Sequence, residues 1–415
     1  MIQNLIEEEK IGNSLNKLLK KPAKQAKYSN SDIFFSLFYS YLSGGDCLED
    51  INESSRELNQ IRGFQCVSSD TAARRLKHWS ESNTVYTSYN YQSPITNTVN
   101  YASDVNNLIK RTTTKNLQLE GNTKGCCLDI DAHFAPSEKG DANYSYKKMR
   151  GYYPLYSCIG LHAVDVEIRN GNTSPSYHLK EHAFRVINKM KKSGVTIKEV
   201  RSDAAAYQNE FMDSLNRKRI RFFIRAKNSK SLKEKALSLN YEQVARDHNG
   251  EELYCWDEFS HNGYRIIVQR EQTNDKELTL LSNTPEHKYN YRMIITNDRR
   301  KKATGDFIIN YYNKRGDMER NFAFLRSDFS WKKLPFKKIE ENATYMAVTA
   351  LMSNLFEWIK LKLKEKVPSF KSVHIRLKKF LNCFAAVPAK WMRTARQTYL
   401  VLYTDKDYSG LLTPK

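Results

Sequence analysis

Residues 195–227 read VTIKEVRSDAAAYQNEFMDSLNRKRIRFFIRAK. Two short apolar runs, VTIKEVRSD and IRFFIRAK, enclose a segment with helical periodicity from about Tyr207 to Arg217. Apolar runs of this length, bounded by polar residues, are typical of buried strands. A strand, a helix and another strand in this order predict an α/β layer with a largely buried sheet.

The chain before this unit has the same character. CCLDID, at 126–131, is a short apolar run that ends in acids, and we expect a buried strand there. The polar stretch 135–153 is expected to form a long loop or hairpin, and LYSCIGLHAV, at 155–164, a second strand. A helix from about Glu181 to Lys192 then leads into the next strand. We therefore assign residues 123–227 to the first part of an α/β core.

A β-rich insertion and a helical C-terminal region follow. Residues 228–302 predict an antiparallel β insertion, with a short helix from Ser231 to Leu239 and the strand-like runs ELYCWDEF, YRIIVQRE, ELTLLSN and YRMIITN. Residues 303–415 are expected to form the second part of the core. One long helix from Gly305 to about Asp328 comes first, and the later elements are helices at 343–366 and 372–384 and a strand at 398–403.

Residues 1–105 are predicted to form a helical N-terminal DNA-binding domain. Helices are expected at 32–42, 48–58 and 69–79, and the pair Ser69-Asp70 is suited to cap the last of them. Short helices with a basic last member suit DNA recognition, although a plain helical bundle explains them equally well. The segment 80–122 is rich in Ser, Thr, Asn and Tyr and predicts a linker.

The charge balance indicates a polyanionic partner. The 415-residue chain has 67 Lys and Arg against 46 Asp and Glu, which gives a net charge of +21. Residues 301–415 alone hold 23 basic and 10 acidic side chains. Such a field attracts nucleic acid, although a solubilising surface is the simpler explanation of the charges.

Neither disulfides nor a membrane span is expected. The seven cysteines are odd in number and contain no Cys-x-x-Cys pair, which argues against a disulfide framework and a zinc ribbon. No window approaches the ~18 uncharged apolar residues of a transmembrane helix, and the acidic start MIQNLIEEEKIGN is unlike a secretory signal. We expect a chain of the reducing cytoplasm that does not contact a membrane.

Three acids occupy positions suited to a metal site. Asp131 ends the strand CCLDID, Asp203 ends VTIKEVRSD, and Glu319 lies in the long helix after the insertion. Carboxylates placed in this way can converge at the carboxyl edge of an α/β sheet. Such oxygen ligands suit Mg²⁺ or Mn²⁺, and two of these ions can promote phosphodiester cleavage. Because surface-facing Asp at strand ends is common, the triad needs further support.

The helix around Glu319 supplies that support. At about 100° per residue, one stripe about 60° wide holds Tyr312, Arg315, Glu319 and Arg326. A Glu that holds a metal, together with Arg and Tyr side chains that hold phosphate oxygens, accounts for this stripe. A solvated, salt-bridged helix face explains the charges but not Tyr312.

The stretch from Tyr312 to Pro335, YNKRGDMERNFAFLRSDFSWKKLP, resembles the Y-x2-R-x3-E-x6-K signature of bacterial insertion-sequence DDE transposases. The broad group is the insertion-sequence-4-like superfamily, and the finer similarity is to its insertion-sequence-1380-like branch. Three features suggest that branch: the Arg-Gly-x-Met-Glu motif around Glu319, the Leu-Pro dipeptide downstream of it, and the expected helix NATYMAVTALMSNLFEWI. In all, the resemblance covers about Gly125 to Tyr403 and includes LDIDAH at the first acid.

The resemblance implies a fold and an activity. The fold is an RNase H-like catalytic core interrupted by the β insertion, in which Asp131, Asp203 and Glu319 bind two Mg²⁺ or Mn²⁺ ions. The activity is strand cleavage at transposon ends, followed by transfer of the freed 3′-OH into target DNA. The implied partners are double-stranded DNA, as terminal inverted repeats and as target, and a second copy in a homodimer on paired ends. The implied location is the bacterial cytoplasm, at the nucleoid.

The same resemblance implies phosphate contacts for Tyr312, Arg315 and Arg326. Further DNA contacts are expected just after the signature and in the loop after the first acid, from Trp331, Lys332, Lys333, Lys147 and Lys148. Trp331 could stack on a flipped base or could anchor a helix end in the core. The basic loop could grip DNA or be solvated.

Some positions depart from the family pattern or have competing candidates. The family more often has Lys where this chain has Arg326, and Asp-x-Asp-x-Thr where His133 stands last. His133 could touch a metal, orient Asp131 or do neither. Asp129 competes with Asp131 as the first ligand, because alternate strand residues face the same way; we favour Asp131, which is nearer the strand end.

Two other functions are open at this point. A catalytically decayed or domesticated transposase would keep a basic DNA-binding surface without catalysis, and the intact acids argue against it. A metal-dependent nuclease would cut strands but never join them.

Overall fold

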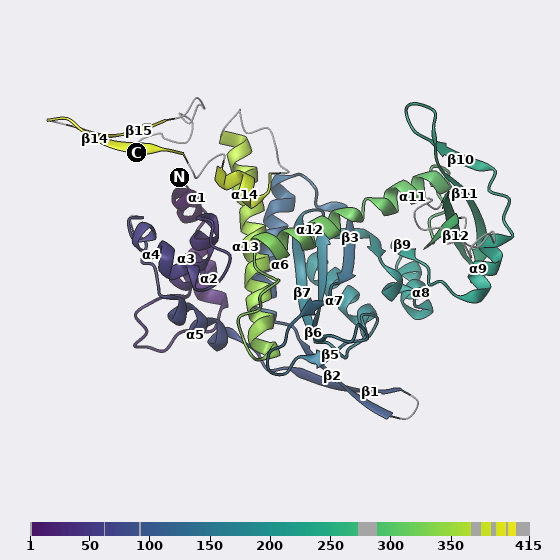
Figure 1. Ribbon diagram of the computed structural model, residues 1–415, viewed down its shortest axis with the longest axis horizontal. Coiled ribbons are helices and arrows are strands. Elements are labelled where there is room, and N and C mark those ends of the chain that lie inside the picture. Colours follow the sequence, from purple (N-terminus) through teal and green to yellow (C-terminus); the bar gives the residue numbers. More distant parts are fainter. Residues whose placement is uncertain are drawn as a thin grey trace, which may run out of the picture.

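The computed structural model describes residues 2–61, 63–90, 93–272, 289–366, 375–382, 387–395 and 397–403. The N-terminal helices pack at one end, a sheet flanked by helices forms the middle, and a β-rich unit forms the opposite end (Figure 1). Within the described ranges, no helix has both the length and the apolarity needed to cross a membrane.

Most of the described strands form one large sheet. They are β1 (Thr84–Asn90), β2 (Ser93–Asn100), β3 (Lys124–Ala132), β4 (Ala135–Pro136), β5 (Asn143–Tyr144), β6 (Arg150–Ile159), β7 (His162–Asn170), β8 (Thr196–Ser202), β9 (Arg221–Arg225), β10 (Gln243–Arg246), β11 (Glu252–His261), β12 (Tyr264–Gln272) and β13 (Tyr289–Thr296). Their order is β1-β2-β7-β6-β3-β8-β9-β13-β12-β11-β10, and the short strands β4 and β5 pair with β6 beside this path.

β3 lies inside the sheet, between β6 and β8, and confirms the strand predicted at CCLDID. β6 runs antiparallel to β3 and to β7, whereas β8 and β9 continue on the other side of β3 in parallel. The single strand predicted at 155–164 is wrong, because the chain reverses at Gly160 and this run supplies parts of both β6 and β7. Gly160 has a φ of +58°, which suits a tight reversal. Both strands are almost wholly buried, so no polar break in the pattern marked the turn.

Helices cover both faces of the core sheet. On one face, α12 (Gly316–Asp328) and α13 (Ile339–Lys366) share a hydrophobic core with residues of β6 and β7. On the other face, α7 (Leu179–Lys192) and α8 (Asn209–Arg217) pack on β3, β8 and β9. The alternation of strands and helices predicted for 123–227 is therefore confirmed, and α13 confirms the helix predicted at 343–366.

The predicted β insertion is antiparallel and continues the core sheet. The strands β10 to β13 pair in antiparallel fashion, and α9 (Lys230–Leu237) precedes them. β13 then pairs with β9, where Ile294 lies opposite Arg225. The run ELTLLSN lies outside the described residues. The insertion is thus joined to the core by a strand ladder as well as by the chain itself.

The helices predicted near the N-terminus are confirmed. They are α3 (Asn30–Leu42), α4 (Asp50–Leu58) and α5 (Ser69–Trp79), preceded by α1 (Ile2–Glu8) and α2 (Ile11–Leu18). The cap of α5 is Ser68 rather than the predicted pair one residue later, because its side chain accepts a hydrogen bond from the amide of Thr71.

The linker predicted at 80–122 is wrong. The segment folds into the β1–β2 hairpin and α6 (Ser103–Leu119), a helix that packs on α13 and β7. Its polar residues are buried in hydrogen bonds: Asn106 Nδ2 donates to the carbonyl of Val166 at 2.8 Å, and Asn116 Nδ2 to that of Asn354 at 3.0 Å. A polar composition therefore hid a buried helix.

The long helix predicted at 305–328 is also wrong, because it is broken. The first part is α11 (Gly305–Asn313), and α12 begins at Gly316. Lys314 and Arg315 form the turn between them. The single stripe calculated across the break therefore holds only for the residues of α12 and its cap.

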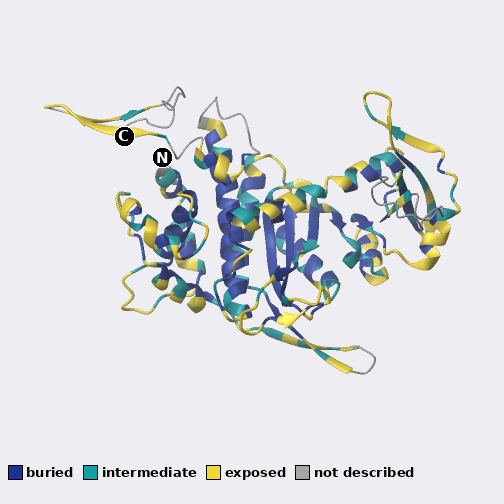
Figure 2. Cartoon of the chain, in the orientation of Figure 1, coloured by how far each residue is buried: buried dark blue, intermediate teal, exposed yellow. Residues whose placement is uncertain are grey.

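The C-terminal elements are small. The helix predicted at 372–384 is represented by α14 (Leu377–Phe380) and lies partly outside the described residues. The predicted last strand is β15 (Thr398–Leu402), which pairs with β14 (Ala389–Arg393) in a separate hairpin. This hairpin projects from the body and is largely exposed (Figure 2).

Candidate active site

The first carboxylate meets a cation from the broken helix. Asp131 is near the end of β3, and Arg315 sits in the turn between α11 and α12. Nη2 of Arg315 lies 2.8 Å from Oδ2 of Asp131, while Oδ1 accepts a hydrogen bond from the amide of Ala132 at 3.0 Å. The break in the helix turns Arg315 toward the sheet, so the two predicted site residues are in direct contact.

The second carboxylate lies close to the first. Asp203 follows β8, and its Oδ1 accepts a hydrogen bond from the amide of Ala205 at 3.0 Å. Burial raises the pKa of Asp131 to about 6; the charge of Arg315 opposes this rise and that of Asp203 adds to it. Two neighbouring carboxylates in a half-buried site are the donors that a divalent cation can neutralise.

Asp129 has a different role from Asp131. Its two oxygens accept hydrogen bonds from Nε and Nη2 of Arg201, both at 2.7 Å, in a buried bidentate pair. Burial raises the pKa of Asp129, and the hydrogen bonds and charge of Arg201 oppose that rise. With its oxygens committed to Arg201, Asp129 is the weaker candidate for a metal ligand.

Glu319 lies on the surface of α12. It makes no hydrogen bond or ion pair with any residue that the structure describes, and its side chain is exposed. At about 100° per residue, Arg315, Glu319 and Arg326 still share one side of α12 and its cap. Arg315 reaches Asp131, and Nη1 of Arg326 lies 3.4 Å from Nε2 of His133. Glu319 therefore stands between two residues that both reach the end of β3.

The three acids are nevertheless not gathered into a closed metal site. Among the described residues, the His, Cys, Asp and Glu side chains whose ligand atoms all lie within 4.8 Å of one another are those of Asp46, Cys47 and Asp50. That group is a capping arrangement, because Oδ2 of Asp50 accepts hydrogen bonds from the amides of Asp46 and Cys47. Asp131, Asp203 and Glu319 fit a divalent cation by their donor chemistry, and the exposed side chain of Glu319 is not held by another described residue.

Tyr312 does not face solvent. It is buried near the end of α11, and its hydroxyl donates a weak hydrogen bond, 3.4 Å long, to the carbonyl of Ser202. Burial raises the pKa of Tyr312. The predicted phosphate contact of Tyr312 stays a prediction, while in this conformation the side chain ties α11 to the residue before Asp203.

A further cation, not among the predicted site residues, lies beside these groups. Arg225 ends β9 and is half-buried, and its side chain makes no hydrogen bond or ion pair with any described residue. Burial lowers the pKa of Arg225, and the charges of Arg292 and Arg315 lower it further, while Tyr312 opposes them. A half-buried cation among like charges is suited to bind an anion. Its position at the end of a buried apolar run was the available signal.

A basic-aromatic surface lies next to the end of β3. Lys147 and Lys148 are exposed in the turn before β6, and Nζ of Lys147 lies 5.8 Å from the ring centroid of Phe134. Burial lowers the pKa of His133, and the charges of Arg326 and Lys147 contribute to this. The predicted contacts Lys147 and Arg326 therefore lie on one surface beside His133.

Trp331 does not support the predicted DNA contact in this conformation. The side chain is 2% exposed, and its Nε1 donates to Oγ1 of Thr349 at 2.9 Å. It packs against Phe322 and Tyr156, as expected of a core tryptophan. The following residues, Lys332 and Lys333, are exposed, and Lys332 lines a hollow of about 110 Å³ with His133 and Arg326.

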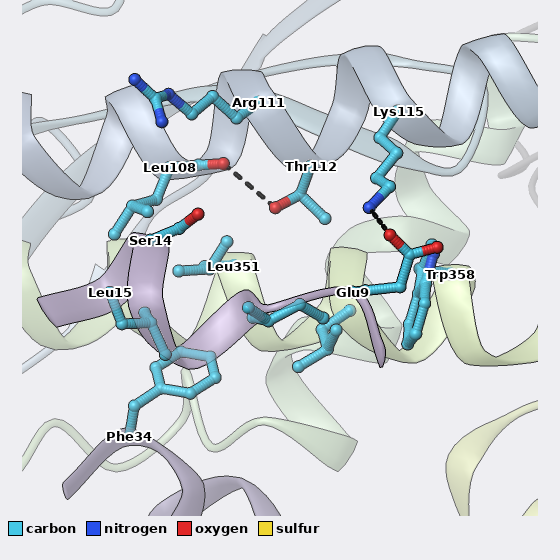
Figure 3. A pocket seen from close by; sticks show the side chains of 12 residues that line it. Glu9, Ser14, Leu15, Phe34, Leu108, Arg111, Thr112, Lys115, Leu351 and Trp358 are labelled. Atoms are coloured by element: carbon cyan, nitrogen blue, oxygen red, sulfur yellow. Dashed lines mark hydrogen bonds and ion pairs between the residues drawn. The ribbon is translucent and has the colours of Figure 1, made fainter. Parts of the chain in front are cut away.

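Another hollow, of about 100 Å³, contains none of the predicted site residues. It lies where the N-terminal helices meet α6 and α13, with Leu15, Phe34 and Leu351 in its apolar lining (Figure 3). At its rim Lys115 pairs with Glu9. These contacts join the N-terminal region to the core.

The chain matches a family model described as transposase DDE domain group 1 over residues 1–413. No curated protein matches its sequence. Among solved structures, it is similar to a chain of the piggyBac transposase synaptic complex with hairpin DNA, with 11% sequence identity and a TM-score of 0.45. That similarity covers 90% of this chain and 76% of the other chain.

Proposed function

The chain belongs to the transposase DDE domain group 1 family, and from this we propose that it cuts DNA at transposon ends and joins the freed ends to target DNA. The observation that carries the proposal is the contact between Arg315 and Asp131 beside Asp203. A pair of strand-end carboxylates and a guanidinium suited to phosphate meet at one point of the sheet.

We assign an RNase H-like fold to the core. The strand order β7-β6-β3-β8-β9 supports this assignment, with β6 antiparallel to its neighbours and β3, β8 and β9 parallel. The assignment to the insertion-sequence-4-like superfamily and its insertion-sequence-1380-like branch rests on the sequence motif around Glu319.

In the proposed reaction, Asp131, Asp203 and Glu319 hold two Mg²⁺ or Mn²⁺ ions. When bound, such ions activate the attacking oxygen and stabilise the leaving oxygen of a phosphodiester. Arg315 and Arg225 bind oxygens of the phosphate to be cut, because the guanidinium fork matches phosphate geometry. Burial around these side chains strengthens their electrostatic effect on the charge that develops there.

The DNA follows the basic surface beside the end of β3. Lys147, Lys148, Arg326 and Lys332 are exposed there and contact the backbone of double-stranded DNA, both at the terminal inverted repeats and at the target. Lys333 extends this surface past α12. Two DNA ends must be brought together, so the active form is a homodimer on paired ends.

Cleavage of DNA that carries the gene's own flanking repeats tests the proposal. Wild type is incubated with Mg²⁺ or Mn²⁺ beside Glu319→Gln, which keeps the shape and removes the ligand charge. Glu181→Gln is the matched control, because Glu181 is an exposed acid in the first turn of α7. We expect wild type and Glu181→Gln to cut and Glu319→Gln to lose at least about 10²–10³-fold in rate, with DNA binding retained.

Each other outcome has a definite meaning. Binding without cleavage by wild type would support the catalytically decayed transposase, a DNA-binding protein. Cleavage without joined products would support a nuclease. If Glu319→Gln still cleaves DNA, Glu319 is not the third metal ligand and another residue must supply it.

A further inference from the structure

The break between α11 and α12 changes the hydrogen bonds of the backbone. In a continuous helix the amide of Arg315 would bond to the carbonyl of Tyr311. Here that amide bonds to the carbonyl of Tyr312 instead, at 2.8 Å. The Tyr311 carbonyl, at the last turn of α11, is thereby left for another donor.

Arg201 supplies that donor. Its Nη1 lies 2.8 Å from the carbonyl oxygen of Tyr311, and its guanidinium carbon lies 5.0 Å from the centroid of the Tyr311 ring. Its other nitrogens, Nε and Nη2, hold Asp129 at 2.7 Å each. One guanidinium therefore connects β8, which carries it, with β3 and with the end of α11.

The position of Arg315 depends on this connection. β8 holds both Tyr311, through Arg201, and Tyr312, which bonds to the Ser202 carbonyl. The turn that contains Arg315 begins two residues after Tyr312. From this turn Arg315 reaches Asp131 at 2.8 Å. Arg201 and Tyr312 therefore fix the last turn of α11, from which the chain leads directly to Arg315.

We propose that Arg201, held in place by Asp129, is a positioning residue of the cleavage reaction. It fixes the end of α11 so that Arg315 is directed at Asp131, and it does not itself touch DNA or the metal ions. The inference rests on the proposed function. It also gives Asp129 a part in the site other than metal binding.

Burial alone does not explain this arrangement. A buried ion pair gains little net stability over apolar side chains of similar size, because both charges must leave water. Arg201 instead satisfies three acceptors on two elements with one planar group. Lys keeps the charge but, as a single ammonium, cannot reproduce the fork toward Asp129 and the bond to Tyr311 together.

A double-mutant cycle tests the proposal. The variants are Arg201→Lys, Arg315→Lys and the double variant, and the readouts are the single-turnover cleavage rate and the dissociation constant for end DNA. We expect Arg201→Lys to slow cleavage about 10–100-fold while DNA affinity changes less than about threefold. Because Arg201 acts through Arg315, the double variant should be no slower than Arg315→Lys, within about twofold.

Arg185→Lys is the matched control. Arg185 forms ion pairs with the buried acids Asp165 and Glu167, on strand β7 and away from α11. We expect this variant to lose thermal stability like Arg201→Lys but to cut at the wild-type rate. Asp129→Asn is a milder second variant, which should slow cleavage less than Arg201→Lys.

The outcomes separate this inference from the proposed function. If wild type does not cut, the proposed function fails. If wild type cuts and the effects of Arg201→Lys and Arg315→Lys multiply, Arg201 acts independently of Arg315 and the positioning role is refuted. If Arg185→Lys slows cleavage as much as Arg201→Lys does, the effect of Arg201 on the rate is explained by lost stability, and the positioning role is likewise refuted.

Discussion

Nη2 of Arg315 lies 2.8 Å from Oδ2 of Asp131, although the two residues belong to a helix break and a strand end far apart in the sequence. Burial raises the pKa of the Asp131 carboxyl, and the charge of Arg315 opposes this rise by stabilising the carboxylate. The contact therefore joins Asp131, a predicted metal ligand, to Arg315, a predicted phosphate contact.

The raised pKa of Asp131 predicts a pH dependence for metal binding. Burial raises this pKa to about 6, and a ligand carboxyl must be deprotonated to bind a cation. We expect Mn²⁺ affinity to fall about tenfold per pH unit below pH ~6 and to level off above it. Calorimetric titration between pH 5 and 8 measures this. Arg315→Gln removes the charge that opposes the rise, so its transition should move to higher pH; a shift to lower pH would contradict the assignment.

The basic loop before β6 predicts a salt dependence of DNA binding. Lys147 and Lys148 are exposed beside the end of β3. Replacing both by Ala should reduce the slope of log affinity against log salt by about 2, because two phosphate contacts are lost. The pair Lys191 and Lys192, in the last turn of α7, is a matched control with the same charge change. Equal slopes for both pairs would remove the loop from the DNA path.

A buried network between β7 and α7 predicts a loss of stability in acid. Burial lowers the pKa of His182 below 6.5, so on acidification the unfolded chain takes up a proton there first. Burial alone would raise the pKa of Glu167, but Arg169 and His182 hold it well below 4.5, and the unfolded chain is again the better proton acceptor. The His182 contribution is complete above about pH 6.5 and is lost as the pH falls below that value, whereas the Glu167 contribution is complete above about pH 4.5 and is lost only in stronger acid.

Urea unfolding from pH 8 to pH 5 measures the part of this loss that is due to His182. Each unit of pKa depression contributes about 1.4 kcal/mol to the free energy of unfolding. His182→Asn should lower stability at pH 8 and flatten the slope between pH 6.5 and 5. A slope equal to that of wild type would show that His182 does not cause it.

The contact of α11 with the insertion predicts the effect of a single methyl group. A Cβ at Gly305 would lie 2.1 Å from Cε3 of Trp256, whereas a Cβ at Gly316 would meet no atom within 4 Å. Gly305→Ala should therefore destabilise the protein by about 1–3 kcal/mol through overpacking. Gly316→Ala, the control, should be neutral or stabilising by up to about 1 kcal/mol in thermal unfolding. Equal effects would mean that the Trp256 ring moves aside freely.

Local patterns predicted the strands that end at Asp131 and Asp203, because short apolar runs bounded by acids have one main interpretation in an α/β layer. The same patterns failed where burial involved polar side chains. The polar residues of α6, such as Asn106 and Asn116, favour a linker by composition, yet both are buried in hydrogen bonds to other elements. Such partners are far away in the sequence and leave no local signal.

The site was predicted in its residue types better than in its geometry. The break before Gly316 was missed because the apolar periodicity continues through it, and the carbonyl that Arg201 holds is invisible to a side-chain pattern. Asp129 and Asp131 are equivalent in the sequence alternation, and only the bidentate pair with Arg201 distinguishes them.

The pairing of β13 with β9 gives the insertion a fixed length scale. Strands in a ladder are spaced by roughly 4.8 Å, so β10, at the far edge, stands about 19 Å from β9. Since β9 lies next to β8, which leads to Asp203, each strand of the insertion stands at a fixed multiple of the strand spacing from that edge of the core. Lengthening a loop at the outer edge of the insertion leaves these distances unchanged. Adding or removing a strand would change the width of the insertion by one strand spacing.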